Sequence, residues 1–109
     1  MANRKNTLWK RLGEILLSFR SDKKISLNVV AKEIKIDKAV LSKIERGKKY
    51  ATRDQVVKLF NYYNFDDNMP LIAWLADKIL FQLGSEEVAL KAMQVAEESL
   101  IYTTKKTLP

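Results

Sequence analysis

Residues 27–47 (LNVVAKEIKIDKAVLSKIERG) decide most of what the sequence predicts about the fold. Apolar residues recur in this segment at intervals of three or four, so each half presents one buried helix face. The apolar positions are Val30, Ile34, Ile36, Leu41 and Ile44, with the small Ala31 placed where a second helix can cross closely. The segment therefore predicts two short amphipathic helices that pack against each other across a tight turn.

The ends of both helices carry their own signals. Ser26 and Asp37 precede the two helices, and either side chain can accept hydrogen bonds from the unpaired amides of a first turn. Gly47 follows the second helix and can adopt the left-handed backbone that ends it. The predicted arrangement is a helix-turn-helix, whose second helix lies in the major groove of DNA.

Composition excludes several classes of protein. A chain of 109 residues with 47% hydrophobic content is about one domain with a packed core. Because cysteine and histidine are absent, disulfides, zinc fingers, thiolate nucleophiles and imidazole bases are excluded. No glycine-rich phosphate loop occurs, so we expect no enzyme, no cofactor and no metal. No small-molecule site is evident, and we expect Val29, Val30, Leu41 and Ile44 to form core rather than a ligand pocket.

The sequence also indicates a location. No apolar run approaches the roughly 20 residues of a membrane span, and no signal-peptide pattern opens the chain. The lack of cysteine fits a reducing compartment. We therefore expect a cytoplasmic protein with no membrane partner.

Positive charge is concentrated in the first half of the chain. Residues 1–53 contain fifteen Lys and Arg against five Asp and Glu, a net charge of +10, whereas residues 54–109 carry a net charge of −3. A basic half that contains a helix-turn-helix suggests a DNA-facing side, and the mildly acidic half suggests a separate partner-facing side. The alternative is that the lysines simply keep a small protein soluble.

The apolar periodicity elsewhere predicts an all-α fold of five to six helices. A first helix is expected over residues 7–19, a fourth after the cap residue Thr52 to about residue 63, a fifth over 70–83 and a sixth over 86–102. Residues 103–109 lack an apolar stripe and are expected to fray. We expect residues 1–65 to form a helix-turn-helix DNA-binding domain and residues 66–109 a helical extension for dimerisation.

Residues 12–64 resemble the lambda-repressor/Cro-type helix-turn-helix family, often called the XRE family. The resemblance rests on the apolar template and on Ser26, Ala31, Asp37, the run Leu41-Ser42-Lys43-Ile44-Glu45-Arg46-Gly47-Lys48 and the fourth helix starting at Thr52. The family usually has glycine where this chain has Lys35, and a left-handed backbone there would cost a non-glycine residue roughly 1 kcal/mol. The compact chain also resembles controller proteins of restriction–modification systems and small autoregulatory repressors.

The resemblance implies which residues bind DNA. The N-terminal part of the third helix would enter the major groove and present Lys38, Ala39, Ser42 and Lys43 to the bases. Lysine can donate to guanine O6 and N7, and the alanine methyl can contact a thymine methyl. Contacts to the DNA backbone are expected from Asn28, Arg46, Lys48, Lys49, Tyr50 and Arg53. For each residue taken alone, a solvated surface side chain is the alternative.

Two further sets of residues are expected to be structural. In the family, a basic residue near the end of the first helix pairs with the glutamate of the Glu-Arg-Gly segment, which implies an ion pair between Arg20 and Glu45. The last two helices carry more apolar surface than one core face requires, which favours a symmetric homodimer. The candidate interface residues are Trp74, Phe81, Met93 and Leu100, of which some must face the chain's own core. The alternative is a monomer in which these helices cover the first four.

These features together predict a sequence-specific transcriptional regulator, a repressor or autoregulator, that binds duplex DNA as a homodimer on a palindromic operator. One alternative is an antitoxin that binds a toxin protein as well as its own operator, for which a long or sticky extension would be the sign. Another alternative is a protein–protein adaptor that kept the fold and lost DNA binding.

Overall fold

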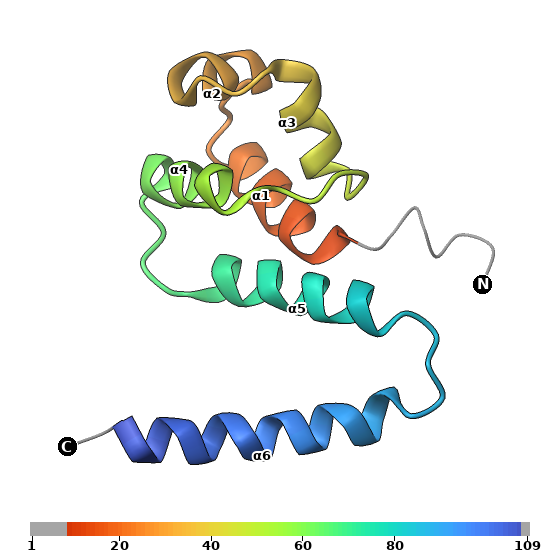
Figure 1. Cartoon of the computed structure of the whole chain (residues 1–109). Helices are drawn as coiled ribbons and strands as arrows, with labels where there is room; N and C mark the ends of the chain where they lie inside the picture. The colour runs from red at the N-terminus through yellow and green to blue at the C-terminus, as the bar shows by residue number, and fades with distance from the viewer. Residues whose placement is uncertain (1–8, 108–109) are drawn as a thin grey trace.

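A computed structural model describes the chain over residues 9–107, and within this range it forms six helices (Figure 1). They are α1 (Lys10–Asp22), α2 (Leu27–Ile34), α3 (Lys38–Glu45), α4 (Arg53–Tyr63), α5 (Met69–Leu83) and α6 (Ala89–Thr107). The predicted all-α fold with a C-terminal helical extension is confirmed. No helix among these residues is long and apolar enough to cross a membrane.

Helices α1 to α5 enclose the core. α1 packs against α3 and α5, α2 packs against α3 and α4, and α4 packs against α5. The most deeply buried apolar side chains come from all of the first four helices: Leu16, Val30, Leu41, Ile44, Val56 and Leu59. α3 therefore lies at the surface of this core with one face packed inward and the other free.

Three side-chain caps determine where helices begin. Ser26 Oγ accepts from the amide three residues later at 3.2 Å, and Asp37 Oδ1 accepts from the Ala39 amide at 2.8 Å. Thr52 and Gln55 form a reciprocal capping box, each backbone amide donating to the side chain of the other. The three predicted caps are confirmed, and a cap of this kind contributes about 1 kcal/mol.

Val29 does not lie in the core, and that part of the sequence prediction was wrong. Val29 is 48% exposed, whereas Val30 is fully buried. Successive residues of a helix point about 100° apart, so only Val30, Ala31 and Ile34 turn inward within the short α2. Val29 is an exposed apolar residue on the first turn of α2.

The first and last helices differ in extent from the prediction. α1 begins at Lys10 and runs to Asp22, three residues beyond the expected end, while residues 7 and 8 lie outside the described range. α6 begins at Ala89 and continues to Thr107, so the expectation of fraying was wrong for residues 103–107. Adding residues to an existing helix is far easier than nucleating one, which lets α6 continue past its apolar stripe. Residues 108 and 109 lie outside the described range.

The turn between α2 and α3 contains a left-handed residue that is not glycine. Lys35 has φ 58° and ψ 46°, the conformation that the expected glycine would adopt without strain. In this conformation the Ile36 amide donates to the Ala31 carbonyl at 3.0 Å and closes the end of α2. The chain keeps the geometry of the turn at a cost of roughly 1 kcal/mol for the lysine side chain.

Lys35→Gly should therefore stabilise the protein by about 1 kcal/mol, less what the greater freedom of glycine costs in the unfolded chain. Urea unfolding followed by circular dichroism measures the difference. Lys32→Gly is the matched control, because Lys32 lies within the right-handed α2 and its replacement should destabilise by up to about 1 kcal/mol. Midpoints that move in the same direction for both variants would contradict a strained backbone at Lys35.

α5 has one face in the core and a second apolar face outside it. Pro70, Ala73, Trp74 and Asp77 are buried, and α5 packs on α1 and α4. On the opposite side, Ile72, Leu75 and Ile79 are about half exposed. The expected domain boundary at residues 65 and 66 falls in the connection between α4 and α5, yet α5 itself contributes to the core of the first four helices.

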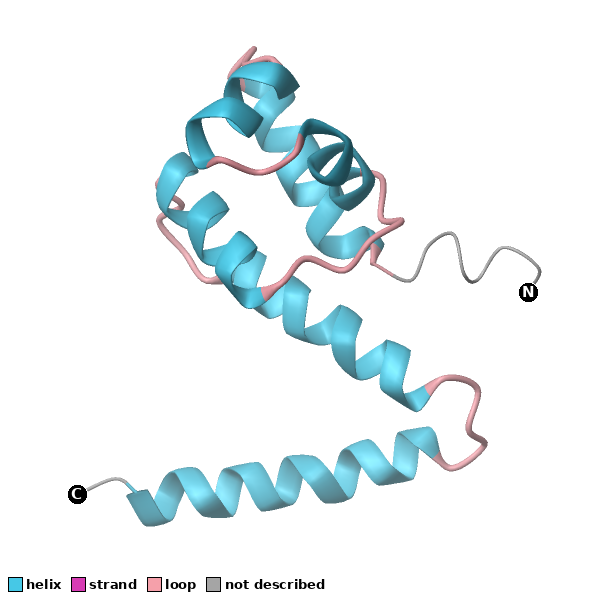
Figure 2. Ribbon diagram, turned by 45° about the horizontal axis from the view of Figure 1, so that its top comes forward, coloured by secondary structure: helices cyan, strands magenta, loops and turns pink. Residues whose placement is uncertain are grey.

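α6 lies apart from the first four helices in both views (Figures 1 and 2). Among the described residues it has no extensive packing contact with any other helix. The radius of gyration is 16.0 Å, against about 13 Å for a compact domain of this length. We refer to α6 as the arm.

Candidate nucleic-acid interface

The outer face of α3 is the centre of the candidate interface. Its inward face packs on α1 and α2. On the outside of α3, Lys38, Ala39 and Lys43 are exposed and Ser42 is half-buried. Arg46, which follows the helix directly, is also exposed. Ala39, Lys43 and Arg46 are spaced by four and three residues, so they lie on one side of the helix. The residues predicted to contact bases are thus at the surface, and two of them are lysines.

The residues predicted to contact the DNA backbone lie at helix ends and in the loop after α3. Asn28 is in the first turn of α2 and Arg53 is in the first turn of α4, where unpaired amides favour a nearby anion. Lys48 and Lys49 are exposed in the loop. Arg46 follows α3 directly, and its Nε donates to the Ser42 carbonyl at 3.3 Å. Cationic or polar groups therefore flank the outer face of α3 along the chain.

Tyr50 is the member of this set with strong contacts inside the protein. Its ring stacks on Trp74 with centroids 5.3 Å apart and contacts Trp9 at 4.6 Å. Its hydroxyl donates to the Trp74 carbonyl at 3.4 Å. Burial, followed by the charge of Asp77, raises the pKa of Tyr50 above its usual value. Tyr50 therefore anchors the loop after α3 to α5.

Gly13 lets α1 approach the end of α3 at backbone distance. A Cβ atom at Gly13 would lie 2.6 Å from the carbonyl oxygens of both Ile44 and Glu45. Gly47, with φ 74°, ends the turn after α3 and would place a Cβ 3.0 Å from the Lys10 Cα. Two glycines thus fix how closely α3 and its following turn lie on α1, and Gly47 has the predicted left-handed backbone.

The structure brings Arg20 and Glu45 together in a bidentate contact. Arg20 Nε and Nη2 donate to the two Glu45 oxygens at 2.7 and 2.9 Å, and Arg20 Nη1 donates to the Ile25 carbonyl at 2.9 Å. The Glu45 side chain is 4% exposed and the Arg20 side chain is 17% exposed. The hydrogen bond to Glu45 raises the pKa of Arg20, so the guanidinium remains charged. One guanidinium therefore joins α1, α3 and the segment that precedes α2.

Comparison with known families gives one match that covers more than half of the chain. A model of the helix-turn-helix domain matches residues 11–70. The chain belongs to this helix-turn-helix family. Domains of this kind are typical of DNA-binding regulators. Searches among curated proteins and among solved structures gave no match.

A carboxylate of α5, which the sequence did not lead us to predict, binds the first turn of α1 in the helix-turn-helix domain. Asp77 of α5 is 1% exposed, and it accepts from the Leu12 amide at 3.3 Å and from Arg11 Nη1 at 3.2 Å. Since the N-cap residue Trp9 offers no side-chain hydrogen bond, Asp77 caps α1 from a distant helix. The signal in the sequence was a single acidic residue in a helix that is mostly apolar.

Trp74 was predicted as an interface residue, and the structure contradicts this. Trp74 is only 6% exposed, and its indole N–H donates to the Ala51 carbonyl at 2.7 Å. A buried indole needs such a partner, and the helix-turn-helix domain supplies it. Of the other candidates, Phe81, Met93 and Leu100 are exposed, and Phe81 also contacts Trp9 at 4.6 Å.

Tyr63 places an unpaired hydroxyl beside the core of the helix-turn-helix domain. Its oxygen is buried with no hydrogen-bond partner, and its ring lies 5.1 Å from that of Phe19. Burial, followed by the negative charge of Glu45, raises the pKa of Tyr63 to about 12. The hydroxyl therefore stays neutral across the physiological range.

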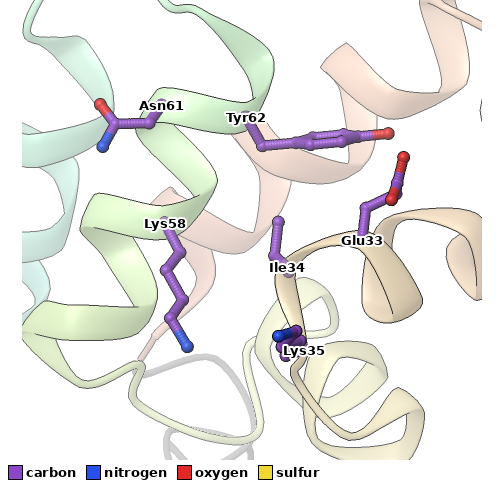
Figure 3. Close-up of a pocket in the computed structure, with 6 residues that line it drawn as sticks. All are labelled: Glu33, Ile34, Lys35, Lys58, Asn61 and Tyr62. Carbon is purple, nitrogen blue, oxygen red and sulfur yellow. The ribbon is translucent and has the colours of Figure 1, made fainter.

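A shallow hollow lies on the helix-turn-helix domain between α4 and the end of α2. Figure 3 shows the Tyr62 ring extending over Ile34 toward Glu33, with Lys58 on the other side. The hollow encloses about 460 Å³. Most of its lining side chains are exposed, so it lacks the convergent buried polar groups of a ligand site.

Proposed function

We propose that the chain is a transcriptional regulator that binds duplex DNA as a homodimer, with α3 in the major groove of each half-site. The observation that carries this proposal is the basic outer face of α3 on a helix whose position is fixed by Gly13, Gly47 and Glu45. A rigidly held helix can present side chains to base edges in one register, as recognition requires. The net charge of +10 over residues 1–53 supplies the attraction to phosphates.

Sequence readout is assigned to the first turns of α3. We assign Lys38 and Lys43 to donate to guanine O6 and N7, and the methyl group of Ala39 to contact a thymine methyl. Ser42 can bond either a base or a phosphate. We assign phosphate contacts to Asn28, Arg46, Lys48, Lys49 and Arg53, which position the protein without selecting a sequence. Tyr50, also predicted for this role, is left out because its hydroxyl donates to the Trp74 carbonyl. A repressor or autoregulator on a palindromic operator is the form of regulation we propose.

Two lysine variants separate readout from positioning. Lys43→Ala should cost about 1–3 kcal/mol on the preferred duplex and relax specificity at one base step. Lys48→Ala should weaken all duplexes alike and reduce the salt slope by about one charge. Fluorescence anisotropy with a duplex selected from a random pool, and with its scrambled sequence, measures both effects. If both variants bind every duplex as the wild type does, the assignment of α3 to the groove is wrong.

The homodimer is assigned to α5 and α6 because many of their apolar side chains are exposed in the described part of the chain. Phe81, Met93 and Leu100 are all exposed, and a two-fold interface would hold two α3 helices for half-sites about 10 bp apart. Light scattering of the wild type should give twice 12.6 kDa. A mass of 12.6 kDa that does not change on concentration would overturn the dimer.

Leu100→Glu should yield a folded monomer with weakened operator affinity, because Leu100 is 68% exposed and contributes nothing to the core. Leu17→Glu on α1 is the matched control, since it also replaces an exposed leucine by glutamate. Circular dichroism checks the fold, and light scattering with anisotropy checks mass and affinity. Equal loss of dimer and affinity in both variants would contradict an interface on α6.

A second candidate is an antitoxin, and the exposed arm is the observation that favours it. An antitoxin would present such an apolar helix to a toxin protein and also bind its own operator. The two candidates predict different states of the arm in the isolated protein. A regulator covers its arm by dimerisation, whereas an antitoxin leaves its arm uncovered. An arm that is cut by protease in the isolated protein at micromolar concentration would support the antitoxin and contradict the homodimer.

A further inference from the structure

An apolar cleft separates α5 from the arm. Ile79 and Leu83 of α5 face Met93, Ala96 and Leu100 of the arm across about 590 Å³. The two helices meet at their connection and diverge from it in the view of Figure 2, and they make no extensive packing contact with each other. Helices in contact pack with their axes 8–10 Å apart, so an apolar cleft between them leaves room for side chains of a further element.

The arm carries apolar residues on more than one side of the helix. Ala89, Met93, Ala96 and Leu100 follow one another at four, three and four residues and form one apolar seam. Outside this seam the arm also exposes Leu90, Val95, Ile101 and Tyr102. A helix without tertiary contacts is only marginally stable in water, and more than one apolar side calls for more than one neighbour.

The exposed area matches that of a dimer interface. A dozen large apolar side chains of α5 and the arm are each about half exposed. Taking roughly 100 Å² for a fully exposed side chain of this size, they present on the order of 600 Å² of apolar surface per chain. A standard interface takes about 800 Å² from each partner. A second copy therefore has enough surface to cover both helices.

We propose that two copies exchange their arms, each arm filling the cleft between α5 and the arm of the other copy. The inference rests on the proposed homodimer and adds how its interface is built. The result is a four-helix arrangement of two α5 helices and two arms, in which each arm contacts the partner's α5 and the partner's arm. Each arm then has two helical neighbours, and the free face of α5 is covered.

The side chains along the apolar seam of one arm are complementary in size to those of a second, antiparallel arm. With a two-fold axis between Gln94 and Val95, Met93 of one arm lies opposite Ala96 of the other. The same axis places Leu100 opposite Ala89. Each large side chain meets a small one, as close packing of two helices requires. This match follows from the spacing of large and small residues along the arm, and it favours pairing with a second copy of the same chain.

The connection between α5 and the arm permits the exchange. Gly84 ends α5 with φ 57°, and a Cβ built there would meet nothing within 4 Å. Among the described residues the arm makes no extensive packing contact with the helix-turn-helix domain, so the connection over residues 84–88 largely sets its direction. Exchange of an element between copies is favoured where a short connection joins it to the body.

Engineered cysteines test the exchange, since the chain has none of its own. One chain carries Ile79→Cys, a second and longer tagged chain carries Ala96→Cys, and the two are refolded together. A short bismaleimide should link the two kinds of chain to each other. A double variant with both cysteines should give a covalent product of twice 12.6 kDa. In the control, Lys91→Cys replaces Ala96→Cys. Because Lys91 lies on the side of the arm opposite the apolar seam, this pair should give little cross-linked product.

The outcomes separate this inference from the proposed function. A link within one chain of the double variant, or no link in the mixed pair while the mass stays twice 12.6 kDa, overturns the exchange and leaves the homodimer intact. A wild-type mass of 12.6 kDa overturns both. Binding of duplex DNA is measured separately on the unmodified chain and depends on neither result.

Discussion

Gly13→Val should destabilise the protein by at least about 3 kcal/mol, the upper end of the usual range for overpacking. The side chain would have to occupy space within 2.6 Å of two backbone carbonyl oxygens, those of Ile44 and Glu45. Neither oxygen can move without moving the end of α3. The variant should also lose affinity for DNA at temperatures where it is still folded, because α3 is pushed away from α1.

The direction of the stability change at Gly13 also tests the close approach of α1 and α3. In an unconstrained helix, replacing glycine by alanine stabilises by up to about 1 kcal/mol, so Gly13→Ala should also destabilise here, against the intrinsic preference. Ser18→Val is the matched control for a β-branched residue in α1, because Ser18 is exposed. Thermal unfolding measures all three variants. A Gly13→Ala variant more stable than the wild type would rule out the close approach of α1 and α3.

Glu45→Ala should destabilise the protein by about 3 kcal/mol, the lower end of the range for breaking a buried ion pair. Arg20 would keep its bond to the Ile25 carbonyl and lose both bonds to a carboxylate that is almost fully buried. The unpaired guanidinium is the source of the loss, so replacing both partners should cost much less than the sum. The measurement is urea unfolding of Glu45→Ala, Arg20→Met and the variant that combines these two substitutions.

Lys48→Ala serves as the control for charge alone, because Lys48 is exposed and should leave the unfolding midpoint nearly unchanged. An additive double variant, or a Glu45→Ala variant as stable as Lys48→Ala, would show that Arg20 and Glu45 do not depend on each other.

The parts of the fold that sequence reasoning predicted are those whose causes are local. Ser26, Asp37 and Thr52 cap helices through amides two or three residues away, and the intervals between apolar residues fix which helix faces turn inward. Such features depend on a window of a few residues and can be derived from one sequence. The left-handed backbone at Lys35 followed only from the resemblance, which places glycine at this position, and the structure has that conformation.

The features that were missed depend on contacts between distant residues. Asp77 caps α1 across 65 positions of the chain, and its role depends on how α5 crosses α1. Gly13 matters because α3 arrives beside it, and a single glycine in a helical pattern does not say what approaches it. Trp74 was assigned to an interface because the apolar residues of α5 encircle the helix, and periodicity alone does not say which side meets the core. The same ambiguity placed Val29 wrongly.

The most direct test of the central claim is a titration of the wild-type protein against duplex DNA at several salt concentrations, using the sequence selected from a random pool and its scrambled counterpart. We expect tighter binding to the selected duplex and a logarithmic salt slope of about −3.6 for each chain, from the phosphate contacts of Arg46, Lys48, Lys49 and Arg53. Equal affinity for both sequences with no dependence on salt, or no binding to either, would contradict a DNA-reading α3 and favour a protein adaptor.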